Sequence, residues 1–83
     1  QPADEAERAE QRRRLLATLA RLSPRHQEVV ALKYFGGLRN QEIAAALGLD
    51  QRTVGAHLSR ALAELQRLLG GPAAASAWEA AAD

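Results

Sequence analysis

Residues 39–62, RNQEIAAALGLDQRTVGAHLSRAL, decide the fold of this 83-residue chain. Their pattern predicts two short helices joined by a tight turn. Ile43 and Leu47 fall on one face of the first helix, and Gly48 follows as the residue that most easily takes a positive φ. Asp50 is a good N-cap for the second helix. The apolar stripe expected on that helix is Val54, Leu58, Ala61, Leu62 and Leu65.

Two helices joined in this way form a helix-turn-helix, the motif whose second helix can enter the major groove of DNA. The apolar period, the N-cap and the turn glycine all agree here, so the signal is specific for a single sequence. The less specific interpretation is an ordinary pair of packed helices.

Two more helices are predicted before this motif, and no segment alternates like a strand. The first is expected over residues 4–22. Its buried stripe would be Leu15, Leu16, Leu19 and Leu22. Ser23 and Pro24 can cap and begin the second helix, which Gly36-Gly37 would end. Its expected core residues are Val29, Val30, Leu32, Tyr34 and Phe35. The prediction is an all-α, four-helix domain with a C-terminal helix-turn-helix.

Composition is that of a globular protein, with 47% hydrophobic and 25% charged residues. We expect one domain over residues 1–69 and a Gly/Pro/Ala-rich tail over residues 70–83, where Trp78 is the one large apolar group. The chain has no cysteine, no run long enough to span a membrane and no signal-peptide pattern. We therefore expect a cytoplasmic protein without a membrane partner. Because the chain begins with Gln1, we expect it to be a piece of a longer protein.

Charge is segregated along the chain, although the net charge is only +1. Residues 1–10 carry a net charge of −3, residues 11–67 a net charge of +6, and residues 68–83 a net charge of −2. A basic middle segment is typical of a domain that binds a polyanion. Arginines exposed only to solvent would produce the same excess.

Catalytic chemistry finds little support in the sequence. His26 and His57 are the only histidines, and no nucleophile elbow or phosphate-binding glycine loop is present. Between the acidic ends of the chain, over residues 11–78, helical spacing brings no two carboxylates together. We therefore expect no catalytic residues, no cofactor and no bound metal.

The start of the second motif helix is where we expect contacts to base edges. Gln51 can pair with adenine and Arg52 with guanine or a phosphate. Gly55 lets the backbone approach closely, and Ala56 can contact a thymine methyl. Flanking phosphates are expected to meet a basic set, Arg60, Arg39, Lys33 and Arg67.

Residues 16–69 closely resemble region four of bacterial sigma factors, especially the extracytoplasmic-function group. The motifs that carry the resemblance are Leu22-Ser23-Pro24, Ala31-Leu32-Lys33-Tyr34-Phe35, Gly37-Leu38, Glu42-Ile43-Ala44, Leu47-Gly48, Thr53-Val54 and Ser59-Arg60-Ala61-Leu62. The similarity spans roughly residues 5–69, and the combined motifs are far more specific than a helix-turn-helix alone.

The resemblance implies binding to the minus-thirty-five element of promoter DNA as part of an RNA polymerase holoenzyme. It also implies docking on the flap of the polymerase β subunit, and masking by an anti-sigma factor or another regulatory protein. The family's base-reading positions fall on Gln51, Arg52, Gly55 and Ala56, and its basic position before Ala-Leu falls on Arg60.

The chain departs from the family pattern at three places. Arg39 replaces a usual serine cap, and we expect Asn40 to cap one residue later. Asp50 replaces another serine cap and adds a negative charge. Gly55-Ala56 replaces a basic-polar pair, and a glycine inside a helix costs about 1 kcal/mol relative to alanine.

Two other interpretations stay open at this point. The His57-Leu58 pair also fits the DNA-binding output domain of a response regulator. A mainly protein-binding module would instead use the acidic ends of the chain and Trp78.

Overall fold

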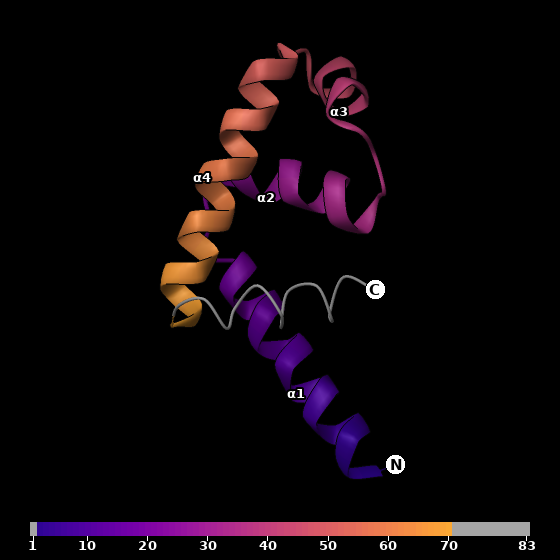
Figure 1. Cartoon of the computed structure of the whole chain (residues 1–83), viewed down its shortest axis with the longest axis vertical. Coiled ribbons are helices and arrows are strands. Elements are labelled where there is room, and N and C mark those ends of the chain that lie inside the picture. The colour runs from indigo at the N-terminus through magenta and orange to yellow at the C-terminus, as the bar shows by residue number, and fades with distance from the viewer. Residues whose placement is uncertain (1, 71–83) are drawn as a thin grey trace.

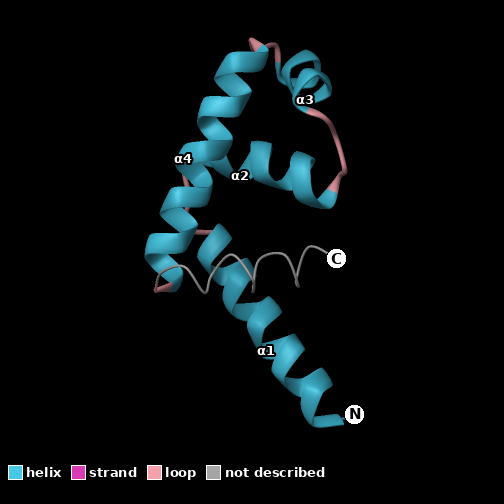
Figure 2. Ribbon diagram, viewed as in Figure 1, coloured by secondary structure: helices cyan, strands magenta, loops and turns pink. Residues whose placement is uncertain are grey.

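The computed structural model describes residues 2–70, and all of its regular structure is helical (Figures 1 and 2). The elements in chain order are α1 (Pro2–Leu19), α2 (Pro24–Val30), a π-helical turn η1 (Ala31–Phe35), α3 (Asn40–Leu47) and α4 (Gln51–Leu69). This confirms the predicted all-α, four-helix class. The tail with Trp78 lies outside the described residues.

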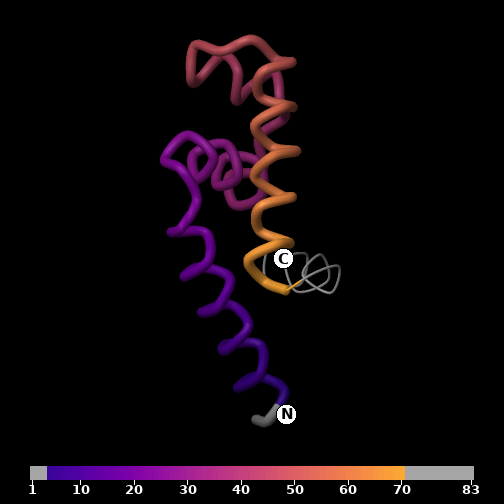
Figure 3. The backbone as a smooth tube through the Cα atoms, turned by 90° about the vertical axis from the view of Figure 1, so that its left-hand side faces the viewer, coloured from indigo at the N-terminus to yellow at the C-terminus, as the bar shows by residue number. Residues whose placement is uncertain are grey.

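The long helix α4 organises the domain, because α1, α2 and α3 all pack against it. Figure 3 shows α4 as a straight rod beside the other helices. The predicted stripe on α4 is confirmed for Val54, Leu58, Ala61 and Leu65, which are buried, whereas Leu62 is partly buried. Ala44 of α3 is also buried, where a small residue lets two crossing helices approach closely.

Helix α1 departs from the prediction in length and in its buried face. It ends at Leu19 rather than at Leu22, although Leu22 is buried in the turn that follows. Leu15 is 1% exposed, but Leu16 is 50% exposed, so its assignment to the core was wrong. Adjacent helical residues point about 100° apart, and α1 buries only the narrow face near its C-terminal end, where it packs against α4.

The two ends of α1 lie in different surroundings. Thr18 is buried on this helix, and its hydroxyl donates to the Arg14 carbonyl oxygen at 2.7 Å, so the buried hydroxyl is satisfied. The first turns of α1 extend away from the other helices in both views (Figures 1 and 3). Consequently residues 10–14, including three arginines, are exposed.

Helix α2 begins as predicted and then widens. The Ser23 hydroxyl accepts a hydrogen bond from the His26 backbone N–H at 3.4 Å, and Pro24 is the first helical residue. The chain continues into η1, which ends with the Gly36 N–H donating to the Ala31 carbonyl oxygen at 2.9 Å. Gly37 then takes a φ of 71°, which confirms the glycine stop.

The π-helical turn η1 explains why Phe35 was placed wrongly in the core. Its wider winding breaks the i, i+3, i+6 spacing on which that prediction rested. Val29 and Val30 are fully buried, Leu32 and Tyr34 are partly buried against the core, and Phe35 is 50% exposed.

The two glycines of the motif allow a matched test of backbone conformation. Gly48 ends α3 with a φ of 68°, so Gly48→Ala should lower the free energy of unfolding by about 1 kcal/mol. Gly55 lies inside α4, where an added Cβ would meet only the Asn40 amide nitrogen at 3.9 Å. Gly55→Ala should therefore raise that free energy by about 0.5–1 kcal/mol. Urea unfolding followed by circular dichroism measures both; equal effects would contradict the assigned backbone.

Candidate nucleic-acid interface

The N-terminus of α4 is presented to solvent by the turn that precedes it. The Asp50 carboxylate accepts a hydrogen bond from the Arg52 backbone N–H at 2.7 Å, which confirms the predicted N-cap. Gln51, Arg52 and Ala56 are exposed, and Gly55 is half-buried on the flank that faces Asn40. The structure therefore brings together the four residues predicted to face base edges.

Two arginines on this helix are available to a polyanion. Arg52 and Arg60 are both exposed, and neither takes part in an ion pair or side-chain hydrogen bond within residues 4–70. Ala56 and Arg60 are one helical turn apart, so they lie on one exposed strip of α4. Arg60 gives the strip a positive charge. The nearby carboxylate of Asp50 accepts a backbone N–H at the start of the helix.

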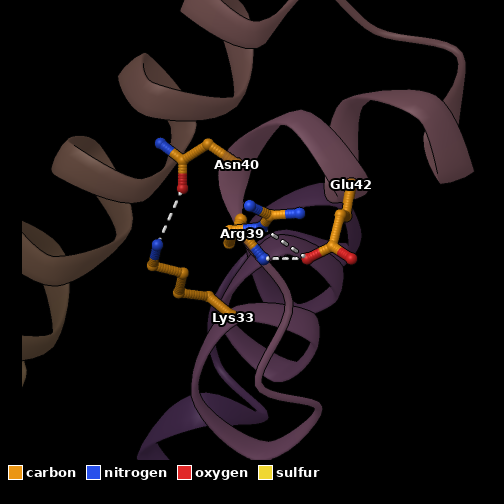
Figure 4. A network of polar contacts seen from close by, with 4 residues as sticks. All are labelled: Lys33, Arg39, Asn40 and Glu42. Carbon is orange, nitrogen blue, oxygen red and sulfur yellow. Dashed lines mark hydrogen bonds and ion pairs between the residues drawn. The ribbon is translucent and has the colours of Figure 1, made fainter.

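Lys33 and Asn40 meet beside this helix (Figure 4). The Lys33 ammonium donates a hydrogen bond to the Asn40 side-chain oxygen at 3.0 Å and links η1 to the first residue of α3. Arg39 takes the N-cap position, so the expectation that Asn40 would cap α3 was wrong. The side-chain amide is occupied by Lys33 instead, and its nitrogen faces Gly55.

Arg39 and Glu42 form a local pair at the start of α3 (Figure 4). The Glu42 carboxylate accepts the Arg39 backbone N–H at 2.8 Å and lies 3.4 Å from the Arg39 guanidinium. The backbone donor, followed by the guanidinium, lowers the pKa of Glu42. Glu42 thus supplies the cap that the Arg39 side chain, which has no acceptor, does not.

Arg67 lies near the other end of α4 and is paired with Glu64 on the same helix. The Arg67 Nε donates to a Glu64 carboxylate oxygen at 3.1 Å, and the two groups form an ion pair. This hydrogen bond lowers the pKa of Glu64 and raises that of Arg67. A phosphate would have to compete with Glu64 for Arg67, as it would with Glu42 for Arg39.

Sequence reasoning missed one pairing, that of His26 on α2 with His57 on α4. Their rings meet edge to face, with centroids 5.3 Å apart. The His57 Nδ1 is buried, and no hydrogen-bond partner for it lies within the described part of the chain. Desolvation, followed by the neighbouring His26, Arg25 and Arg60, lowers the pKa of His57. No sequence signal joins the two histidines, because α2 and α4 come together only through the fold.

Other kinds of site are not indicated by the part of the chain that the structure describes. Among these residues no group of three or more His, Cys, Asp and Glu side chains could hold a metal ion. Their helices are also too short or too polar to cross a membrane.

The fold and the exposed start of α4 define a helix-turn-helix domain. Residues 12–65 match the family model described as sigma-70, region 4, and the chain belongs to this family. The resemblance found in the sequence is thus confirmed, and the response-regulator alternative is not favoured.

Two curated relatives agree with this assignment. The RNA polymerase sigma-E factor of Streptomyces coelicolor is 39% identical over 69 residues, which cover 82% of this chain and 39% of the relative. The protein of the same name from Streptomyces avermitilis is 38% identical over 66 residues, which cover 80% of this chain and 37% of the relative. The chain thus spans about two fifths of the length of these relatives. No solved structure matches the chain.

Proposed function

We propose that this chain is the promoter-reading domain of a sigma factor of the extracytoplasmic-function group. It binds the minus-thirty-five element through α4 and works with core RNA polymerase in the cytoplasm. The observation that carries the proposal is the exposed Arg52 at the capped start of α4, which has no ion pair within the described residues, in a chain of the sigma-70 region 4 family. The role is one of binding, not of catalysis.

The proposed contacts divide into two kinds. Gln51, Arg52, Gly55 and Ala56 face the base edges. Arg60, Arg39, Lys33 and Arg67 face phosphates, which fix the position of the protein without reading the sequence. Lys33 is held by a neutral partner rather than by a carboxylate, because the Asn40 side-chain oxygen accepts from its ammonium beside the flank of α4. Gly55 leaves that flank open, and the Asn40 amide nitrogen adds a donor there.

The protein partners proposed are the flap of the polymerase β subunit and an anti-sigma factor or other regulatory protein. The names of the two relatives, both RNA polymerase sigma-E factors, support a polymerase partner. The exposed apolar side chains of Leu16 and Phe35 are candidates for such protein contacts. A module that binds protein alone would leave the unpaired arginines of α4 without a role.

The test is promoter-directed transcription by core RNA polymerase with the sigma factor that carries this chain. Its DNA targets are first selected by recovering genomic fragments bound by that holoenzyme. We expect polymerase binding and transcription from promoters that share one upstream element. Specific binding of duplex DNA without polymerase binding would overturn the proposal in favour of a response regulator. Polymerase binding without promoter selectivity would instead favour a protein-binding module.

A further inference from the structure

Four basic side chains gather where α2 meets α4, on the side of α4 away from Asn40. We call Arg25, His26, His57 and Arg60 the α2–α4 basic cluster. His26 contacts His57, and Arg25 and Arg60 are near enough to act on the His57 charge. Arg60 belongs both to this cluster and to the exposed strip of α4 on which we place DNA, so the cluster adjoins that strip.

The cluster has many donors and few acceptors. Arg60 has no ion pair within the described chain, and Arg25 is 3.7 Å from Glu28. The other carboxylate near the cluster, Glu64, is hydrogen-bonded to Arg67, which lowers its pKa, and the charges of Arg21 and His26 act on it in the same direction. The two arginines repel a metal cation, and together with the imidazole N–H groups they offer donors to an anion with several oxygens.

We propose that the α2–α4 basic cluster binds a backbone phosphate of promoter DNA and that the His57 imidazole takes up a proton from solvent as the phosphate binds. The proposal rests on the proposed function, since it takes α4 to lie on DNA. Arg25 and Arg60 bind the phosphate, and protonation of His57 adds a positive charge close to it. This makes DNA binding by the domain dependent on pH.

The direction of the effect follows from the charges. Without DNA, desolvation and the neighbouring cations keep His57 neutral at neutral pH, because its pKa is lowered from 6.5. A phosphate offsets those cations and favours the imidazolium. Affinity for DNA should therefore increase as pH falls through the raised pKa of the complex, and should level off below the lowered pKa of the free protein. One proton taken up changes the binding constant by at most about tenfold per pH unit.

The experiment follows the histidine resonances of the 83-residue chain by NMR. Protein labelled at the imidazole carbons is titrated between pH 5 and 8 alone, with a duplex of about 20 base pairs, and with inorganic phosphate at equal ionic strength. The affinity for the duplex is measured by fluorescence anisotropy across the same range. The free energy of unfolding is measured at each pH, so that loss of folded protein in acid is not counted as weaker binding.

We expect the duplex to raise the titration midpoint of His57. The affinity of the protein for the duplex should weaken about three- to tenfold as the pH rises from 6 to 7.5. His57→Gln should flatten this pH profile, and Arg60→Gln should weaken binding and reduce the midpoint change. Arg8→Gln removes one exposed charge from α1 and should leave the pH profile unchanged. If His57→Gln lowers the stability, the exposed Arg60 variant still tests the cluster.

Binding of the duplex with unchanged histidine midpoints would overturn the inference. A midpoint that rises equally with inorganic phosphate, while duplex affinity stays independent of pH, would show an adventitious ion only and would also overturn it. Absence of duplex binding even at low ionic strength overturns it as well. In the first two cases promoter-directed transcription can still succeed, which separates failure of this inference from failure of the proposed function.

Discussion

Replacing Leu15 with alanine should lower the free energy of unfolding by about 2–5 kcal/mol, because the side chain is 1% exposed and its loss leaves a cavity. That is a large fraction of the stability of a domain this small. Leu16→Ala is the matched control, since it makes the same chemical change one residue away on a side chain that is 50% exposed. It should change the free energy by less than about 1 kcal/mol.

Chemical unfolding followed by circular dichroism measures the free energy of unfolding of both leucine variants. Alanine is a good helix former at both positions, so a difference between the variants reports the burial of the lost side chain. A larger effect of Leu16→Ala would mean that α1 turns its other face toward α4. The comparison therefore tests the orientation of α1, which rests on a narrow contact near its C-terminal end.

Arg52→Ala should weaken promoter binding by about 1–3 kcal/mol, or about 5- to 150-fold, if Arg52 reads a base edge. The loss should vanish when the contacted base pair is changed, because that substitution removes the same hydrogen bonds. Binding of the sigma-containing holoenzyme to single-base variants of its minus-thirty-five element measures both effects. Arg52→Lys is a second variant that keeps the charge but not the two-pronged geometry.

Arg60→Ala is the comparison for Arg52 on the same helix. A phosphate contact predicts weaker binding to every sequence and a salt slope shallower by about one. Equal losses on all promoter variants for Arg52→Ala would assign Arg52 to a phosphate instead. Unchanged promoter binding by both variants would contradict the proposed interface.

Much of the fold was predictable because local rules decide it. Gly48 and Asp50 set the turn between α3 and α4 through their own backbone preferences and hydrogen bonds. The apolar period of α4 then identifies the face that meets the core. These signals act within a few residues of one another, so a single sequence contains them.

The errors arose where packing overrides local pattern. Leu16 and Phe35 are apolar residues at helical spacing, yet neither faces a neighbouring helix that would bury it. For Phe35 the cause is the π-helical turn, which changes the angle between successive side chains. Tertiary contacts decide both outcomes, and helical periodicity does not encode them.

The candidate site was predictable in part. Gln51, Arg52, Gly55 and Ala56 share one region because they lie within two turns of one helix. The bond between Lys33 and Asn40 and the contact between His26 and His57 join separate elements. Whether the predicted residues touch DNA stays a prediction.

Because α4 contacts all three other helices, a small rotation of this long helix links displacements at its two ends. A helix of 19 residues is about 28 Å long, so a tilt of one degree about one end displaces the other by about 0.5 Å. Its far end packs near α1, while its near end carries Arg52. We therefore expect a protein that shifts α1 to displace the end of α4 that carries Arg52 without contacting that end.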